Sequence, residues 1–367
     1  SHRANSRKDR HRLHSSHHRC CSTYSLYSTR SLQERQTMTT LTSPHDLLAA
    51  IPFLIGYHPD RSLVLVSLKD DAIGMAMRVD LPSDIAPESY DLLASHLVRE
   101  EADAAFIVAY SGESESDAES AVINTSAALI RAGLDIKESL VVRNNRFRSM
   151  LCTDLTCCPP EGSEIPDLDT SRIAAEHVIA GHPMPYESVE GLVQSIAAVP
   201  SSFELSWQDE VLAFIVSSDA EELNDLQRDG ATAIIDLAGE YREGRGAEDR
   251  ELVARVIGRM SDIQVRDFAL GSHSEESADH YWSMWHQLLR IAPRGFVAPI
   301  ASLFAAMAYE RGEGALAHKA LDRALDDDDQ YSLALLLRRV FTAGWPPHSF
   351  TAMRAELHPK VVATIFG

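Results

Sequence analysis

Ser62-Leu63-Val64-Leu65-Val66-Ser67-Leu68-Lys69-Asp70-Asp71-Ala72 is the stretch that decides the fold class of this 367-residue chain. Ser62 to Leu68 is a segment rich in Val and Leu with apolar side chains on both sides of an extended backbone, which is typical of a strand buried on both faces of a sheet. The polar residues that follow predict a turn, and residues 72–80 then resume as a second strand. Because this connection is short, the two strands are predicted to pair antiparallel.

The elements around this hairpin alternate between helix and strand. A helix is predicted to begin at Ser43, which is suited to cap the first turn, with Pro44 at the first helical position. Further helices are expected over 87–100 and 114–132, and further strands over 104–110 and 140–143. Such alternation is typical of crossover connections between parallel strands. Residues 38–150 are therefore predicted to form an α/β domain with a mixed sheet and flanking helices.

The remainder of the chain has mainly helical periodicity. Residues 151–200 are predicted to be a cysteine-containing connector with helices, and residues 201–367 an all-α C-terminal domain. Helices are expected over 170–180, 187–198, 207–216, 219–243, 247–258, 275–291, 296–310, 314–326 and 330–343. The helix over 296–310 is apolar on most sides, which indicates burial between other helices.

The first 37 residues differ in composition from the rest. They contain eight basic residues and two acidic ones, many serines and few large apolar side chains. Such a segment cannot bury enough apolar surface to offset the entropy lost on ordering. We therefore expect residues 1–37 to be a disordered tail that is not part of the fold, and Met38 to be the natural start.

Composition narrows the class of partner. The chain carries a formal net charge of −20, and an acidic chain repels phosphate backbones, so a nucleic-acid partner is not expected. No apolar run approaches the roughly 18 residues that a membrane span needs, so a membrane partner is not expected either. The five cysteines are an odd number and no secretory signal precedes them, which favours the reducing cytoplasm.

Cys152, Cys157 and Cys158 lie where the strand-like pattern gives way to the helical one. Three thiols at this spacing are candidate metal ligands, and zinc is the metal that such ligands favour, with His177 or His182 as a fourth ligand. A disulfide or thiol relay between Cys152 and one of the adjacent pair is an alternative. The simplest interpretation is that the three are small apolar side chains that fix a loop. No other cofactor is expected.

Arg78, Arg146 and Arg148 are candidate ligand-binding residues. Glu161, which follows the three cysteines in the same loop of the chain, is a fourth candidate. Arg146 and Arg148 lie two apart on an expected strand and so share a face, where two guanidinium groups suit a carboxylate or phosphate. Arg78 is near a strand end, where ligand clefts form in α/β layers. The alternative is salt bridging on an acidic surface. We expect the cysteine loop to pack beside these arginines where the two domains meet.

His58, Asp60 and Asp80 are the candidate catalytic residues, because these groups transfer protons when they lie together. Turns before strands contain the same residue types for backbone reasons, so no catalytic residue is assigned. The chain has no glycine-rich phosphate loop and no nucleophile elbow. The balance is against an enzyme.

Three blocks of sequence carry a resemblance to a known family. They are Leu47-Leu48-Ala49-Ala50-Ile51-Pro52-Phe53-Leu54-Ile55-Gly56-Tyr57-His58-Pro59 ahead of Ser62-Leu63-Val64, then Arg148-Ser149 with Cys157-Cys158-Pro159-Pro160-Glu161-Gly162 after Cys152, and then Gly312-Glu313-Gly314-Ala315-Leu316-Ala317 through to Gly344-Trp345-Pro346-Pro347. With them the chain resembles the actinobacterial family known as domain of unknown function 4192. The resemblance implies a cytoplasmic bacterial protein and implies no activity.

The leading functional hypothesis is a non-enzymatic binding or regulatory module for a small anionic ligand or a protein partner. One alternative is a hydrolase or transferase with a polar site at the domain seam, which requires His58, Asp80 and a cysteine to line one pocket. Another is a helical scaffold protein whose acidic surface meets a basic partner.

Overall fold

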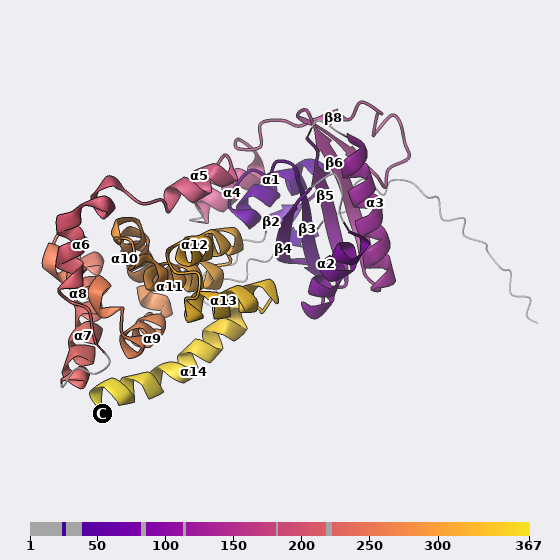
Figure 1. Cartoon of the computed structure of the whole chain (residues 1–367). Coiled ribbons are helices and arrows are strands. Elements are labelled where there is room, and N and C mark those ends of the chain that lie inside the picture. The colour runs from indigo at the N-terminus through magenta and orange to yellow at the C-terminus, as the bar shows by residue number, and fades with distance from the viewer. Residues whose placement is uncertain (1–23, 27–38, 82–85, 113–114, 181–182, 218–221) are drawn as a thin grey trace, which may run out of the picture.

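The computed structural model describes residues 24–26, 39–81, 86–112, 115–180, 183–217 and 222–367. A mixed sheet with its helices forms one half of the molecule, and the C-terminal helices form the other, with α4 and α5 between them (Figure 1). The predicted fold class, an α/β N-terminal part followed by an all-α C-terminal part, is confirmed. Among the described residues, no helix is both long enough and apolar enough to cross a membrane.

The sheet contains eight described strands in the order β2-β1-β4-β3-β5-β6-β7-β8. Their bounds are β1 Tyr24–Leu26, β2 Thr39–Leu41, β3 Ser62–Lys69, β4 Ala72–Asp80, β5 Ala104–Tyr110, β6 Asp135–Arg143, β7 Arg146–Ser149 and β8 Ser163–Glu164. The predicted β3–β4 hairpin is antiparallel, with Asp70 and Asp71 at φ 51° and 62° in its turn. Strands β5 and β6 pair parallel, so the sheet is mixed, as the alternating pattern predicted.

Helices cover both faces of the central strands. On one face α2 (Pro87–Arg99) and α3 (Glu115–Arg131) pack against Leu63, Leu65 and Ile107. On the other face α1 (Pro44–Ile55) and α4 (Arg172–Ile179) belong to the larger core, which includes Val64 and Val66 of the same strand. The centre of strand β3, from Leu63 to Val66, is therefore apolar on both sides because alternate residues enter two different cores.

Helix α1 begins as its sequence predicted. The Ser43 hydroxyl accepts a hydrogen bond from the Asp46 backbone N–H at 3.2 Å, and Pro44 occupies the first turn. The helix ends at Gly56, whose φ of +87° is a left-handed conformation that glycine adopts without strain. The sharp exit brings the chain directly into the turn before β3.

The C-terminal half consists of packed helices, and two of its α-helices were not predicted. The bounds are α5 Val189–Ser195, η1 Pro200–Phe203, α6 Leu205–Leu212, α7 Leu223–Arg242, α8 Arg250–Arg259, α9 Ile263–Gly271, η2 Glu275–Ser277, α10 Ala278–Ile291, α11 Val297–Glu310, α12 Gly314–Asp327, α13 Ser332–Thr342 and α14 Pro347–Phe366. Helix α9 was missed because it is short and starts immediately after α8, capped by Asp262. Helix α14 was missed because it contains Pro359, a residue that normally interrupts helices.

One apolar core connects the two halves. It runs from the α1 face of the sheet through Leu192 and Ile196 to the helices around Trp285 and Phe304. Helix α11 lies inside it, with every residue from Val297 to Ala308 buried, which confirms the burial predicted for this segment. The two predicted domains are therefore joined by packing as well as by the chain.

Three residues of the expected N-terminal tail join the sheet. Strand β1 pairs antiparallel with β2, and Ser25 lies opposite Ala72 of β4. This departs from the expectation that residues 1–37 are outside the fold. The reason is that the edge of β4 offers backbone donors and acceptors, which a short strand can pair with whatever its side chains are. The rest of that segment is outside the described residues.

Candidate metal centre

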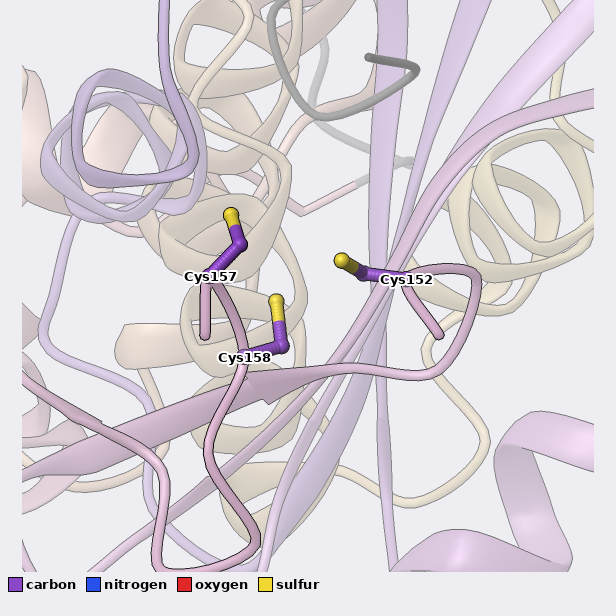
Figure 2. Close-up of side chains that lie close together, drawn as sticks. All are labelled: Cys152, Cys157 and Cys158. Atoms are coloured by element: carbon purple, nitrogen blue, oxygen red, sulfur yellow. The ribbon is translucent and has the colours of Figure 1, made fainter. Parts of the chain in front are cut away.

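The loop between β7 and β8, residues 150–162, brings three cysteine side chains together. We call it the cysteine loop. The Sγ atoms of Cys152, Cys157 and Cys158 all lie within 4.8 Å of one another. The three sulfur atoms point into one shared space, that of Cys152 from one arm of the loop and those of Cys157 and Cys158 from the other (Figure 2). Within the described parts of the chain, no other cluster of three or more potential metal-ligating side chains occurs at this spacing.

A single helical turn positions the adjacent pair. The backbone N–H groups of Cys157 and Cys158 donate to the Asp154 carbonyl oxygen at 3.1 and 2.8 Å. The Asp154 carboxylate in turn accepts from the Thr156 N–H at 2.8 Å, which fixes the start of the turn. This local hydrogen bonding fixes the backbone from which both sulfur atoms project.

A buried carboxyl group anchors the other arm. The backbone N–H groups of Leu151 and Cys152 both donate to the Ser149 hydroxyl oxygen at 3.2 Å, and that hydroxyl donates to Glu138 Oε1 at 2.7 Å. Burial raises the pKa of Glu138, although the hydrogen bonds from Ser149 and from the Ser139 N–H oppose the shift. Cys152 is therefore held through its backbone by the interior of β6. Sequence reasoning missed this arrangement, because Glu138 lies in the polar first half of β6 and carries no pattern that distinguishes it from an exposed acid.

Arg146 closes the loop at its far end. Its Nε donates to the carbonyl oxygens of Glu161 and Gly162, each at 3.0 Å, and its Nη2 donates to Gly162 O at 2.7 Å. Nη1 meets the carboxylate of Glu164 at 3.0 Å. The prediction that the cysteine loop packs beside Arg146 agrees with this geometry, but the guanidinium is occupied by the loop itself. Glu161 accepts the hydrogen bond from Arg146 through its backbone carbonyl oxygen, and the residue is exposed.

Gly162 makes this closure sterically feasible. Its φ is +78°, and a Cβ at this position would lie 2.9 Å from the Phe147 carbonyl oxygen. Only glycine combines the left-handed backbone with so close an approach to strand β7. The Gly162 N–H completes the turn by donating to Pro159 O at 2.9 Å.

The donor set suits a thiophilic divalent ion. Zinc binds thiolates at about 2.3 Å in tetrahedral geometry, which separates the sulfur atoms by about 3.8 Å. The observed limit of 4.8 Å therefore requires the sulfurs to close by no more than about 1 Å. All three are thiols, with Cys157 exposed and the other two half-buried, so the site is open to solvent from the side of Cys157.

The predicted fourth ligands do not complete this set. His177 stacks on Phe53 with ring centroids 4.5 Å apart, and it does not belong to the cluster within 4.8 Å. His182 lies outside the described residues. The described donors are therefore the three sulfur atoms.

The structure separates Arg78 from the cysteine loop. Strand β4 lies four strand spacings from β7 in the sheet, which is about 19 Å at about 4.8 Å per spacing. The side chains of Arg78 and Arg148 also lie on opposite faces of the sheet. Arg78 is opposite Val64, in the core beneath α1, whereas Arg148 is opposite Val141, in the core beneath α2 and α3. The expectation of one pocket shared by Arg78, Arg146 and the loop is therefore wrong, because strand order places Arg78 four strands away from Arg146 and the loop.

The arginine side chains have acidic partners within the protein. Arg148 pairs with Glu119 of α3, and Arg78 pairs with Asp80 while its Nη2 donates to the Asp60 carbonyl oxygen at 3.3 Å. The alternative reading from the sequence, salt bridging, describes these contacts. The role of these residues in ligand binding stays a prediction.

The candidate catalytic residues do not belong to the cluster of thiols. His58 Nε2 is 3.3 Å from Asp169, and the Asp60 carboxylate is 3.3 Å from Arg61 Nε. Asp80 is at the end of β4 with Arg78. Arg78 thus brings Asp80 close to the backbone of Asp60, but neither joins the cysteine cluster.

A polar hollow of about 810 Å³ lies between α7, α8 and α10. Its acidic residues outnumber its arginines, and Arg245 and Arg255 are paired with acids, Arg245 with Glu240 and Arg255 with Glu251, each at 2.7 Å. An excess of carboxylates disfavours an anionic ligand there.

Residues 44–348 match the model of the family described as Domain of unknown function (DUF4192). The chain belongs to that family. The match confirms the resemblance carried by the three sequence blocks, and it includes the whole cysteine loop. No curated protein and no solved structure matched the chain. The attribution of this DUF4192 chain to actinobacteria stays a prediction.

Proposed function

We propose that this DUF4192 protein is a non-enzymatic binding and regulatory module that holds a thiophilic divalent metal ion of the Zn²⁺ class at Cys152, Cys157 and Cys158. The observation that carries the proposal is the approach of three Sγ atoms to within 4.8 Å from the two arms of one loop. A cytoplasmic location accords with it, because a reducing compartment keeps such thiols available as ligands.

The metal would connect segments that are otherwise held separately. Cys152 is anchored to the sheet through Ser149, whereas Cys157 and Cys158 belong to a turn with its own hydrogen bonds. Coordination by all three thiolates joins these arms, so metal binding stabilises one loop conformation. The regulatory effect of the metal is then the change in loop conformation between the metal-bound state, in which the two arms are linked, and the metal-free state.

A protein partner is the ligand proposed for that loop. The loop carries Leu151 and Leu155, which are 44% and 70% exposed, on a protein whose formal net charge is −20. Exposed apolar side chains on a metal-ordered loop favour contact with another protein. The enzyme alternative requires His58, Asp80 and a cysteine to lie together. In the described parts of the chain, His58 and Asp80 do not belong to the cysteine cluster.

Metal analysis tests the proposal. The full chain with Cys20→Ser and Cys21→Ser as background removes the two N-terminal thiols and is titrated with Zn²⁺, and with Co²⁺ as a spectroscopic probe. We expect one equivalent of metal and a thiolate-to-cobalt charge-transfer absorption. Each of Cys152→Ser, Cys157→Ser and Cys158→Ser should weaken binding at least tenfold, with unchanged circular dichroism. Bound zinc below about 0.2 equivalents would end the proposal.

A further inference from the structure

The geometry points to a thiol-oxidation site in the same loop: a hydroperoxide joins Cys152 to Cys157 as a disulfide, and the metal leaves. This inference rests on the proposed metal site for its second half only. The disulfide itself depends on the positions of the sulfur atoms and on the covalent geometry of the chain.

Covalent geometry decides which cysteines pair. Adjacent Cα atoms are about 3.8 Å apart across a trans peptide, whereas disulfides span about 4.4–6.8 Å between Cα atoms. Cys157 and Cys158 are therefore poor partners for each other. Cys152 comes from the opposite arm, with its Sγ within 4.8 Å of both other sulfurs. Every unstrained disulfide within this cluster includes Cys152.

Exposure decides which sulfur the oxidant reaches first. Cys157 is exposed, whereas Cys152 and Cys158 are half-buried. Thiol oxidation by peroxides follows thiolate character and accessibility, so the most exposed of the three sulfurs is the one that reacts first. Cys157 is accordingly the residue that is attacked, and Cys152 is the residue that resolves it.

The reaction takes place in two displacements. The Cys157 thiolate attacks one oxygen of the hydroperoxide, and the O–O bond breaks. An alkoxide or hydroxide departs as the leaving group, and Cys157 becomes a sulfenic acid. The Cys152 thiolate then attacks that sulfur, the S–O bond breaks, hydroxide leaves, and the S–S bond forms. The two sulfurs together lose two electrons and the peroxide gains two. A thiol reductant reverses the change.

Metal release follows from the loss of donors. The disulfide removes two of the three thiolates, and Cys158 alone cannot hold a divalent ion that needs several ligands. The residues between the paired cysteines, 153–156, are all exposed, so the loop can tighten around the new bond without disturbing the buried core. Leu155 lies in this segment, so oxidation also alters the surface offered to a partner.

The test uses the full chain with Cys20→Ser and Cys21→Ser, loaded with zinc and treated with hydrogen peroxide. Released zinc is followed with a chelating dye, and the disulfide is mapped by mass spectrometry of a non-reducing digest. We expect one zinc released per Cys152–Cys157 disulfide formed, and recovery of binding after reduction by dithiothreitol.

The single variants give an asymmetric pattern that a general role in folding would not produce. Cys152→Ser should form no intramolecular disulfide, Cys158→Ser should still form Cys152–Cys157, and Cys157→Ser should form Cys152–Cys158 at a rate lowered at least threefold. A disulfide between Cys157 and Cys158, or one that persists in Cys152→Ser, overturns the inference.

The two proposals fail in different ways. If the chain binds no zinc but still forms the Cys152–Cys157 disulfide, the metal site and its release are refuted and the oxidation site stands. If the chain binds zinc and keeps it, with intact thiols, in excess peroxide, the oxidation site is refuted and the metal site stands.

Discussion

Replacement of Gly162 by alanine should strain the closure of the cysteine loop. The backbone φ of +78° costs an L-residue about 1–2 kcal/mol. The added Cβ would lie 2.9 Å from the Phe147 carbonyl oxygen and 3.3 Å from its carbon, both of which are backbone atoms that cannot rotate away. Overpacking of this kind costs about 1–3 kcal/mol more, and the reduced freedom of the unfolded chain returns about 0.4–1 kcal/mol. The expected net loss is about 1–5 kcal/mol.

Gly133 offers a matched control for the same substitution. Its φ is +84°, but nothing lies within 4 Å of the position that its Cβ would take. Gly133→Ala therefore shares the conformational cost without the steric contact. The difference between the two variants should be about 1–3 kcal/mol, measured from urea unfolding midpoints at constant slope.

Metal affinity provides a second, local measurement for this pair. Displacement of residue 162 moves the end of the loop away from Arg146 and disturbs the approach of the three thiols, so zinc should bind more weakly to Gly162→Ala alone. Equal stability losses in the two variants, together with equal zinc affinities, would show that the contact with Phe147 does not hold the loop.

The remaining predictions concern the helices and the buried acids. In α7, Gly230→Ala should destabilise by about 1–3 kcal/mol, because its methyl would lie 2.9 Å from side chains of α8 and α9; Gly239→Ala, with nothing within 4 Å, should stabilise by about 0.5–1 kcal/mol, both read from urea unfolding. Burial alone would raise the pKa of Glu310, but the hydrogen bond from a buried histidine and the charge of Arg354 outweigh it and lower that pKa below 4.5. Its stabilisation is therefore complete above pH 4.5 and disappears as pH falls through the folded-state pKa; in Arg354→Ala this acid-side loss should be smaller and the chain about 3–5 kcal/mol less stable at pH 7, by unfolding across a pH series. Burial raises the pKa of Glu138 above 4.5, so the wild-type chain should lose stability relative to Glu138→Gln as pH rises from 4.5 through the folded-state value; a constant difference from pH 4 to pH 8 would contradict this.

Local patterns in the sequence determined most of the elements. Strand β3 is apolar on both sides because its alternate residues enter two cores, and the extent of such a run is visible without the fold. Helix α1 was located by Ser43 and Pro44, whose effects act within one turn. Helix α14 was not predicted because a proline such as Pro359 normally ends a helix. In the folded chain, packing against α9, α7 and α11 keeps the helix continuous.

The candidate site was only partly predictable for the same reason. The spacing of the cysteines located the loop, and the proximity of Arg146 followed from its place in the chain. The anchor formed by Glu138 and Ser149 was not predictable, because it joins two strands through side chains that have no shared pattern in the sequence.

The sequence by itself determined the class of the fold, the family and the loop that holds the thiols. Tertiary structure alone decided that Cys152 meets Cys157 and Cys158 across that loop, and that Arg78 lies four strands away from the loop, on the face of the sheet opposite to Arg148. The physical reason is range: caps, turns and periodicity act between residues a few positions apart, whereas strand order is fixed by the packing of helices against both faces. The anchor of the cysteine loop depends on that strand order, because Ser149 of β7 donates to Glu138 of β6.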